Sequence, residues 1–303
     1  MKLAIHGLGK MGSQIVHKLS EDQEFTVIAH NRSPEPIEEA VSEGAIGAYS
    51  KEDILSQFED ERLILWLMLP AEIVDQTLDE WLAIIPKGSL IIDGGNSDFR
   101  ETIERSKKIS SAGSSFMDIG VSGGIWGYQK GFSMMCGSDD PKNFELLRKV
   151  LLKLSQPSGD FDLFGPTGSG HFVKMVHNAI EYGMMESLAE GYRIIKEGPF
   201  RDIKLNNVAR VWQHGSVVTS WLNQLIEQIM NENPNLEGIK GNVAESGEAR
   251  WTLELAKSLS IAMPAIDQSF KVRIESQSGT VNYATKLLSA MRNKFGGHQL
   301  NNS

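Results

Sequence analysis

The chemically richest stretch of the chain is the segment Gly168 to Tyr182, with the sequence GSGHFVKMVHNAIEY. On a helix, its polar side chains recur at i, i+3, i+4, i+7 and i+8 and therefore share one face: Lys174, His177, Asn178, Glu181 and Tyr182. An ammonium group, an imidazole, an amide, a carboxylate and a phenol together could transfer protons and bind a polar substrate. The rest of the circumference is apolar, so we expect a mostly buried helix. Its polar stripe should then face a ligand, because burying such groups without partners is costly. An ordinary amphipathic helix with a solvated face is the alternative.

The bulk properties narrow the class of protein. The chain has 303 residues, which favours two domains, and its 41% hydrophobic and 23% charged content is typical of a globular protein. A net charge of −9 argues against a nucleic-acid binder. The single cysteine, Cys136, excludes an internal disulfide and favours a reducing compartment, so we expect a cytoplasmic protein. The apolar run at residues 63–69 is too short to span a membrane, and no signal peptide precedes the first strand.

A glycine motif at the N-terminus predicts a dinucleotide site. Residues 3–6 read as a strand, residues 13–19 as a helix and residues 25–29 as the next strand. The turn between the first strand and the helix has the pattern G-x-G-x-x-G: Gly7, Leu8, Gly9, Lys10, Met11 and Gly12. In this setting the glycines permit a tight turn and close approach of a pyrophosphate to the helix N-terminus. A tight turn without a ligand is the weaker alternative.

The end of the second strand bears on cofactor choice. An acidic residue there would bind the ribose 2′-hydroxyl of NAD. This chain has Asn31, Arg32 and Ser33 instead, and a guanidinium beside an amide and a hydroxyl suits a 2′-phosphate. The sequence therefore favours NADP, with NAD as the other option. A solvated Arg32 without a ligand is the alternative.

The alternation of strands and helices continues to about residue 165. We expect helices at residues 38–42, 71–84, 100–110 and 141–154, and strands at 63–69, 90–93, 116–119 and 132–136. This order predicts a Rossmann-type doubly wound α/β domain over residues 1–165. Two further strands run into glycine-rich loops, Gly94-Gly95-Asn96-Ser97 and Gly120-Val121-Ser122-Gly123-Gly124. Ligands bind at this edge of such sheets, although each loop alone could be a plain turn.

The second half reads as an all-α domain over residues 166–303. Beyond the opening helix, helical patterns cover residues 206–214, 216–230, 249–260, 265–275 and 283–292. Basic and hydroxyl groups that could bind an anion stand at Arg250, Thr252, Arg273, Arg292 and His298, although exposed arginines are usually surface charges. The histidines lack metal-ligand spacing, so we expect no metal site.

These motifs resemble the 6-phosphogluconate dehydrogenase family, in a short form, within the β-hydroxyacid dehydrogenase superfamily. The resemblance covers essentially the whole chain and rests on GLGKMG, DGGNS (93–97), DIGVSGG (118–124), GHFVKMVHNAIEY (170–182), RWT (250–252) and the tail FGGH (295–298).

The resemblance implies roles by position. Lys174 would be the general base that accepts the substrate's 3-hydroxyl proton, and Glu181 would protonate C1 of the enediol that remains after loss of CO₂. The sugar acid would be held by Asn96, Ser122, Gly123, Gly124, His177 and Asn178. The phosphate would be held by Tyr182, Arg250, Thr252, Arg273, Arg292 and His298. Asn96 would also contact the nicotinamide, and no metal is implied. The family further implies a homodimer, or a tetramer of dimers, in which Arg292 and His298 reach the neighbouring subunit's site.

The chain departs from the family pattern at a few positions. The long form of the family has lysine where Arg250 stands and an acidic stretch where Ile125-Trp126 stands. Short forms often use NAD with an acidic residue after the second strand, where this chain has Asn31-Arg32. Two alternative functions are a β-hydroxyacid dehydrogenase of the 3-hydroxyisobutyrate type and a non-catalytic NADP-binding sensor. The former would not need the basic cluster, and the latter would be expected to have lost Lys174 or Glu181.

Overall fold

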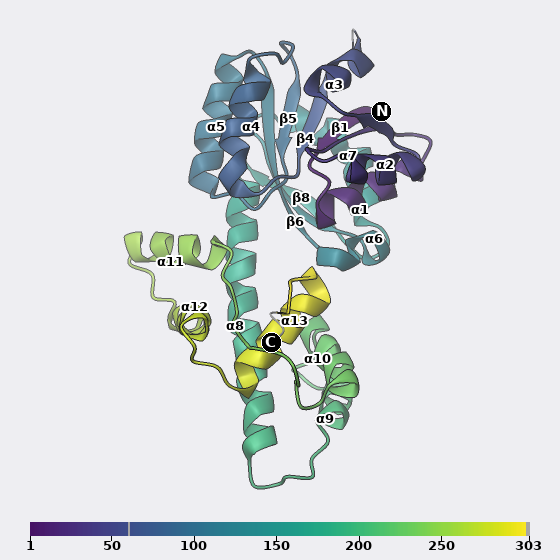
Figure 1. Cartoon of the computed structure of the whole chain (residues 1–303). Coiled ribbons are helices and arrows are strands. Elements are labelled where there is room, and N and C mark those ends of the chain that lie inside the picture. The colour runs from purple at the N-terminus through teal and green to yellow at the C-terminus, as the bar shows by residue number, and fades with distance from the viewer. Residues whose placement is uncertain (60, 301–303) are drawn as a thin grey trace. The chain divides into compact units, whose positions relative to one another are not determined.

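The computed structural model describes residues 1–59 and 61–300, and it divides into two compact units, Met1–Met175 and Val176–Ser303. The helix α8 (Ser169–Glu197) begins in the first unit and continues through the second (Figure 1). None of the described helices is long and apolar enough to cross a membrane.

The first unit is built on an eight-stranded sheet in the order β3-β2-β1-β4-β5-β6-β7-β8. Every neighbouring pair is parallel except β6 and β7. The strands are β1 (Lys2–His6), β2 (Thr26–His30), β3 (Ile46–Ala48), β4 (Ile64–Leu67), β5 (Leu90–Asp93), β6 (Ser115–Ser122), β7 (Ser133–Gly137) and β8 (Phe161–Gly165). The strand order reverses direction between β1 and β4, as in a doubly wound sheet, which confirms the predicted Rossmann-type fold.

Helices cover both faces of this sheet. They are α1 (Lys10–Ser20), α2 (Glu35–Ser42), α3 (Lys51–Phe58), α4 (Ala71–Leu82), α5 (Phe99–Ser111), the 3-10 helix η1 (Gly124–Trp126), α6 (Gly127–Lys130) and α7 (Pro141–Ser155). The apolar core on one face includes residues of α1, α2 and α7, and the core on the other includes residues of α3, α4 and α5. In β1, Leu3 and Ile5 join the first core and Ala4 joins the second. Burial on both faces explains why these strands read as continuous apolar runs.

Several elements of the first unit differ from the sequence-based expectation. β3 and α3 were not predicted, because β3 has only three residues; the local signal for α3 is a capping box between Ser50 and Asp53. β6 extends to Ser122, since Gly120 pairs with Met135 across the antiparallel partner β7. The ligand-facing loop therefore begins after Ser122 rather than at Gly120.

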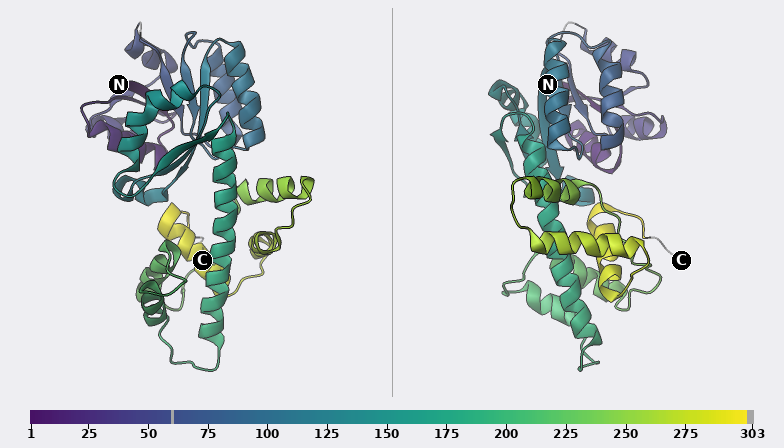
Figure 2. Two further views of the ribbon diagram at one scale, coloured as in Figure 1. Left: turned by 180° about the vertical axis from the view of Figure 1, so that it is seen from behind. Right: turned by 90° about the vertical axis from the view of Figure 1, so that its left-hand side faces the viewer.

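In the second unit the regular elements of the described residues are all helices, which confirms the predicted all-α character. After α8 come α9 (Leu205–Gln213), α10 (Trp221–Glu232), α11 (Glu248–Ser258), α12 (Pro264–Gln277) and α13 (Tyr283–Gly296). One apolar core joins α8 to α9, α10 and α13, and a smaller cluster joins α8 to α11 and α12. These two groups of helices lie on different sides of α8 (Figures 1 and 2).

The expectation that α8 is mostly buried is wrong for part of its apolar surface. Ile180, Met184 and Ile194 are exposed, Ile194 to 70%. Their positions fall on one narrow arc of the helix. The two helix groups cover only part of the circumference of α8, and no described helix of the single chain covers this arc.

Candidate active site

The glycine motif folds as a tight turn between β1 and α1. Gly7 adopts φ +111°, and a Cβ on Gly12 would lie 2.0 Å from the Gly7 carbonyl oxygen, so both positions require glycine. The N-cap residue of α1 is Gly9, which has no side chain that could cap the helix. The first amides of α1 are therefore not capped by a side chain, as a helix N-terminus that binds a pyrophosphate requires.

The β2–α2 loop is tied to this turn. The Asn31 Oδ1 accepts a hydrogen bond from the Leu8 amide at 3.2 Å, and its Nδ2 donates to the Ser33 carbonyl at 3.4 Å. Arg32 is exposed, and no described residue forms an ion pair or hydrogen bond with it. The loop thus leaves a free guanidinium beside the glycine turn, which fits a cofactor bearing a 2′-phosphate.

The loop after β5 presents Asn96 as an exposed residue between the partly buried Gly95 and the buried Ser97. Below it, the buried Asp93 carboxylate accepts hydrogen bonds from the Gly95 amide at 3.0 Å and the Ser97 hydroxyl at 2.8 Å. The Asn96 side chain itself has no hydrogen-bond partner among the described residues. Its amide is therefore held in place by its neighbours and remains available to a ligand.

Lys174 is buried on α8, close against β6. A Cβ on Gly120 would lie 2.3 Å from the Lys174 Cβ, so this approach of helix to strand requires glycine. Two residues further along β6 comes Ser122, which is partly buried, and Gly123 and Gly124 follow at the start of η1. Lys174 therefore lies on a fixed backbone next to the strand that leads into the predicted substrate loop.

The start of α8 is capped from a distance by Asp118 of β6. This buried carboxylate accepts hydrogen bonds from the amides of Gly168 at 2.7 Å and His171 at 2.8 Å. Burial raises the pKa of Asp118. The His171 Nδ1 lies 2.8 Å from the Thr102 hydroxyl of α5, which also bonds the Asp98 carbonyl oxygen. Sequence reasoning gave Asp118 no role of its own, because its partners lie about fifty residues further along the chain.

In the second unit, Tyr182, Arg273 and Arg292 form a buried basic cluster. The Arg273 guanidinium carbon lies 3.2 Å from the centroid of the Tyr182 ring. Among the described residues the guanidinium forms a hydrogen bond only with the Met185 sulfur, from Nη2 at 3.5 Å. No described carboxylate forms a hydrogen bond or ion pair with either arginine. Burial, together with the nearby Arg292, lowers the pKa of Arg273 to about 10, and burial also lowers the pKa of Arg292. Two buried cations without a bonded anion are typical of a site for an anionic ligand.

The other polar side chains of the α8 stripe lie near this cluster along the same helix. The His177 Nδ1 lies 2.9 Å from the Asn178 Oδ1, and the Asn178 Nδ2 donates to Glu248 Oε1 at 2.8 Å. Glu181 is partly exposed, and its carboxylate makes no hydrogen bond to a described residue. Glu186, which sequence reasoning missed, is buried near Arg273, and burial raises its pKa to about 7.

Three further predicted phosphate ligands contact residues outside this cluster. Arg250 is half exposed and forms an ion pair with Glu245. The Thr252 hydroxyl donates to the Glu248 carbonyl oxygen at 2.8 Å. His298 follows the end of α13 and packs edge-to-face on Phe295, with ring centroids 6.5 Å apart.

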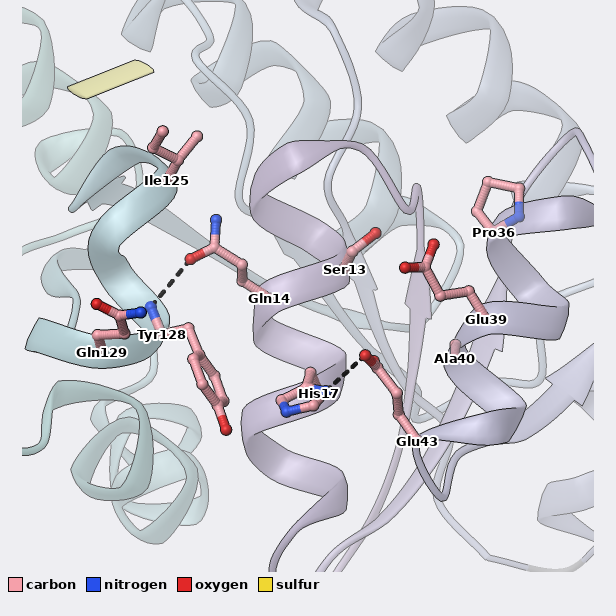
Figure 3. Close-up of a pocket in the computed structure, with 10 residues that line it drawn as sticks. All are labelled: Ser13, Gln14, His17, Pro36, Glu39, Ala40, Glu43, Ile125, Tyr128 and Gln129. Carbon is pink, nitrogen blue, oxygen red and sulfur yellow. Dashed lines mark hydrogen bonds and ion pairs between the residues drawn. The ribbon is translucent and has the colours of Figure 1, made fainter. Parts of the chain in front are cut away.

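A separate pocket of about 320 Å³ lies in the first unit between α1, α2 and the segment from Ile125 to Gln129 (Figure 3). In it, His17 of α1 pairs with Glu43 at 2.7 Å, and the Tyr128 amide donates to Gln14 at 3.0 Å. None of the predicted site residues lines this pocket. The described residues hold no cluster of three or more histidine, cysteine or carboxylate side chains that could bind a metal.

Comparison with known proteins identifies the family to which the chain belongs. Residues 2–165 match the model of the NAD-binding domain of 6-phosphogluconate dehydrogenase, and residues 170–295 match that of the enzyme's C-terminal domain. A Bacillus subtilis protein with a provisional assignment as a 6-phosphogluconate dehydrogenase is 37% identical over 298 residues, 98% of each chain. The NAD-dependent decarboxylating 6-phosphogluconate dehydrogenase of Haloferax volcanii is 34% identical, over 99% of this chain and 98% of that protein.

A solved structure extends the comparison to a longer relative. The Plasmodium falciparum 6-phosphogluconate dehydrogenase, determined without ligand, with NADP⁺ and with 6-phosphogluconate, matches with a TM-score of 0.82 and 25% identity. The match covers 96% of this chain and 70% of that one. The first unit is thus an NAD-binding domain in a short-form chain, and the chain belongs to the 6-phosphogluconate dehydrogenase family of oxidoreductases.

Proposed function

We propose that the protein catalyses the oxidative decarboxylation of 6-phospho-D-gluconate to D-ribulose 5-phosphate and CO₂, with reduction of NADP⁺ or NAD⁺. The observation that supports this most is the pair of buried arginines, Arg273 and Arg292, beside Tyr182 without a bonded carboxylate. A terminal phosphate would supply the missing negative charge through charge-assisted hydrogen bonds. A β-hydroxyacid that lacks a phosphate would leave both charges buried and unpaired.

The family pattern assigns the chemistry to two residues of α8. Lys174 removes the proton of the 3-hydroxyl while the hydride leaves C3, which yields a 3-keto acid. The bound nicotinamide cofactor supplies the hydride acceptor. Loss of CO₂ then leaves an enediol, as Lys174 returns its proton to the oxygen on C3, and Glu181 protonates the carbon that carried the carboxylate, which is C2 of the substrate and C1 of the product. The two side chains are seven residues apart on one helix and therefore share a face.

The other predicted residues would bind and orient. We assign the sugar acid to Asn96, Ser122, Gly123, Gly124, His177 and Asn178, and the phosphate to Tyr182, Arg250, Thr252, Arg273, Arg292 and His298. Arg250 would first have to leave Glu245, with which it pairs in the single chain. The cofactor would lie on Gly7 to Gly12, with Asn31, Arg32 and Ser33 at its 2′ position. The exposed, unpaired Arg32 favours NADP, whereas the Haloferax volcanii relative is named as NAD-dependent.

An absorbance assay of nicotinamide reduction tests the proposed function. The purified protein should reduce the cofactor with 6-phosphogluconate and release one CO₂ for each reduced cofactor formed. The assay is run with NADP⁺ and with NAD⁺ in parallel, and with 3-hydroxyisobutyrate as the competing substrate. Turnover of 3-hydroxyisobutyrate but not of 6-phosphogluconate would contradict the proposal.

We further propose that the protein works as a homodimer. The exposed apolar arc of α8, formed by Ile180, Met184 and Ile194, is a surface that a second copy could cover. The two residues expected to reach the neighbouring subunit, Arg292 and His298, differ in their surroundings in the single chain. Arg292, on α13, is buried and interacts electrostatically with Tyr182 and Glu181 of its own chain. His298 lies beyond the end of α13, against Phe295, and the family pattern assigns it to the neighbouring subunit's site, so we propose that it is the residue that reaches the partner's site.

Mixed dimers test this arrangement. Subunits with Lys174→Met and subunits with His298→Ala should each be weakly active, and a verified heterodimer should regain activity because one of its sites is intact. A heterodimer of Lys174→Met and Arg292→Ala subunits should show no such recovery, since Arg292 serves its own chain. Recovery only in the second pairing would reverse the assignment of the two residues. A monomeric, fully active protein would contradict the dimer itself.

A further inference from the structure

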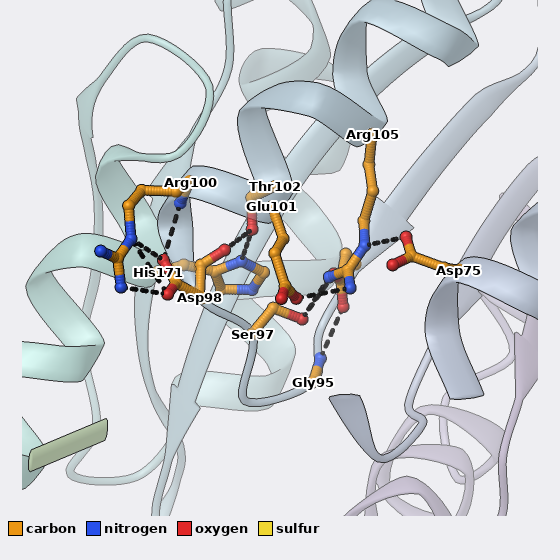
Figure 4. A network of polar contacts seen from close by, with 10 residues as sticks. Asp75, Gly95, Ser97, Asp98, Arg100, Glu101, Thr102, Arg105 and His171 are labelled. Carbon is orange, nitrogen blue, oxygen red and sulfur yellow. Dashed lines mark hydrogen bonds and ion pairs between the residues drawn. The ribbon is translucent and has the colours of Figure 1, made fainter. Parts of the chain in front are cut away.

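Arg105 on α5 is a buried arginine that belongs to none of the motifs of the sequence. Its side chain is 2% exposed, yet each of its nitrogens has a partner (Figure 4). The Nε donates to Asp75 Oδ1 at 2.7 Å and the Nη2 to Glu101 Oε2 at 2.9 Å. The Nη1 donates to Ser97 Oγ at 2.9 Å and to Asp93 Oδ2 at 3.3 Å.

These partners fall into two groups of different character. The carboxylates of Asp75 and Glu101 are 56% and 54% exposed, and water can replace Arg105 at both. Asp93 and Ser97 are buried, and they are the two ends of the loop that carries Asn96. The inward half of the guanidinium therefore fixes the loop, while the outward half holds the guanidinium in its plane.

The loop that carries Asn96 is held by one carboxylate, that of Asp93. Asp93 accepts the Gly95 amide on Oδ1, and on Oδ2 it accepts both the Ser97 hydroxyl and Arg105. Because Arg105 also reaches the Ser97 oxygen directly, both sides of the Asn96 apex depend on one planar group. A planar fork with donors in fixed directions can hold two acceptors at defined angles, which the point charge of a lysine cannot do.

Stability alone does not explain this arrangement. A buried ion pair can often be replaced by apolar side chains with no loss of stability, so its presence here suits a role in fixing geometry. The group whose position it fixes is an exposed amide without a partner among the described residues. Hydride transfer is sensitive to displacements of about 1 Å in the groups that orient substrate and cofactor.

We propose that Arg105 is a positioning residue that sets the Asn96 amide for hydride transfer, acting through Ser97 and Asp93. This inference rests on the proposed function for the nature of the reaction, but not for the contacts that hold the loop. Arg105 itself does not touch the reacting atoms. Its loss should therefore slow the hydride step and leave the binding of the cofactor's phosphates unchanged.

Amide hydrogen exchange tests the structural half without any substrate. In Arg105→Lys, peptides that cover residues 93–98 should exchange at least about tenfold faster than in the wild type, because local opening of the loop becomes easier. Exchange in β1 and α1 should stay the same. Arg148→Lys is the matched control, since it makes the same substitution in an exposed Arg–Glu pair on α7. Unchanged exchange of residues 93–98 in Arg105→Lys would overturn the proposal.

Kinetics with 6-phosphogluconate deuterated at C3 tests the functional half. In Arg105→Lys, kcat should fall about tenfold or more and its deuterium isotope effect should rise, while the Kd for NADP⁺ stays within twofold. Ser97→Ala should reproduce part of the defect and add little to Arg105→Lys, because both changes break one link. Asp75→Asn should have little effect, since its carboxylate lies on the exposed side.

The hydrogen-exchange and kinetic experiments together distinguish a wrong role for Arg105 from a wrong proposed function. A wild-type protein that does not oxidise 6-phosphogluconate would remove the proposed function, and the exchange result would still decide whether Arg105 holds the loop. An active wild type whose Arg105→Lys variant keeps its kcat and isotope effect would overturn the role of Arg105 while the function stands.

Discussion

Arg105 in the first unit and Arg273 in the second are both 2% exposed, but their surroundings are opposite. Arg105 contacts three carboxylates and a hydroxyl. Arg273 stacks on the ring of Tyr182, and within the described part of the chain its side chain hydrogen-bonds only a thioether, with a second buried arginine close by. A buried cation with its own anions belongs to the scaffold, whereas a buried cation without them indicates where an anionic ligand binds.

The electrostatics of the two arginines follow from this difference. Removing one partner of a satisfied buried pair leaves an uncompensated charge, which is strongly destabilising. Removing a buried cation that has no anion relieves a desolvation penalty instead. The first unit should therefore lose stability when its arginine is replaced, and the second should lose ligand binding.

The largest expected effect is on turnover, at Lys174. Lys174→Met should lower kcat by about 10²- to 10⁴-fold, because it removes the general base, while NADP⁺ still binds. The buried Lys18 offers a matched control, since its ammonium donates to the carbonyl oxygens of Tyr128 and Gln156 in the scaffold. Lys18→Met should lower the melting temperature clearly and change kcat little. Near-normal turnover in Lys174→Met would remove this residue from the mechanism.

The next largest expected effect is the difference in stability between variants of the two arginines, which urea unfolding measures. Arg105→Met should lower the free energy of unfolding by about 3–5 kcal/mol, because Asp93 then remains buried without a cation. Arg273→Met should leave stability unchanged or higher and should raise the KM for 6-phosphogluconate about 10- to 100-fold. Equal losses of stability in the two variants would break the distinction between scaffold and site.

Arg32 should decide affinity for the cofactor rather than stability. Arg32→Ala should weaken NADP⁺ binding by about 1.5–3 kcal/mol, the value of hydrogen bonds to a charged group, and should change NAD⁺ binding little. Fluorescence titration with each cofactor measures both values. A wild-type preference for NAD⁺ would show that the interpretation of Asn31-Arg32 as a 2′-phosphate site is wrong.

Glu186 should give a smaller, pH-dependent effect. Burial, with Glu190 nearby and opposed by Arg273, raises its pKa to about 7 from the ordinary value of 4.5. The folded state then holds a proton that the unfolded state releases, so its stability falls as pH rises from about 4.5 through 7. Glu186→Gln should therefore gain about 1–3 kcal/mol relative to the wild type between pH 5 and pH 8.5. A pH-independent difference in the free energy of unfolding would show that Glu186 does not titrate in this range.

What could be predicted from the sequence is mainly what depends on neighbours along the chain. The turn from Gly7 to Gly12 and the apolar strands carry their signal in a few consecutive residues, and both form as expected. Short elements such as β3 and α3 offer too few residues for a periodic pattern. The apolar arc of α8 was misread because periodicity shows that a face is apolar, but not whether the same chain covers it.

The missed site features depend on partners that are distant in sequence. Asp118 caps a helix about fifty residues away, and Arg105 meets Asp75 thirty residues upstream. No local pattern distinguishes these residues from ordinary charged positions. The same limit applies to Arg273, since only the fold reveals that it is buried and without a carboxylate. The catalytic and binding roles assigned to Lys174, Glu181 and the other site residues stay predictions until they are measured.

The most direct test of the account compares two substrates that differ only in the phosphate. If Arg273 and Arg292 bind the phosphate, kcat/KM for 6-phosphogluconate should exceed that for gluconate by at least about 100-fold in the wild type. In Arg273→Met, which should fold normally, the ratio should fall about tenfold or more. A wild-type ratio near one, or a ratio that Arg273→Met leaves unchanged, would contradict the claim that this buried cluster recognises the phosphate.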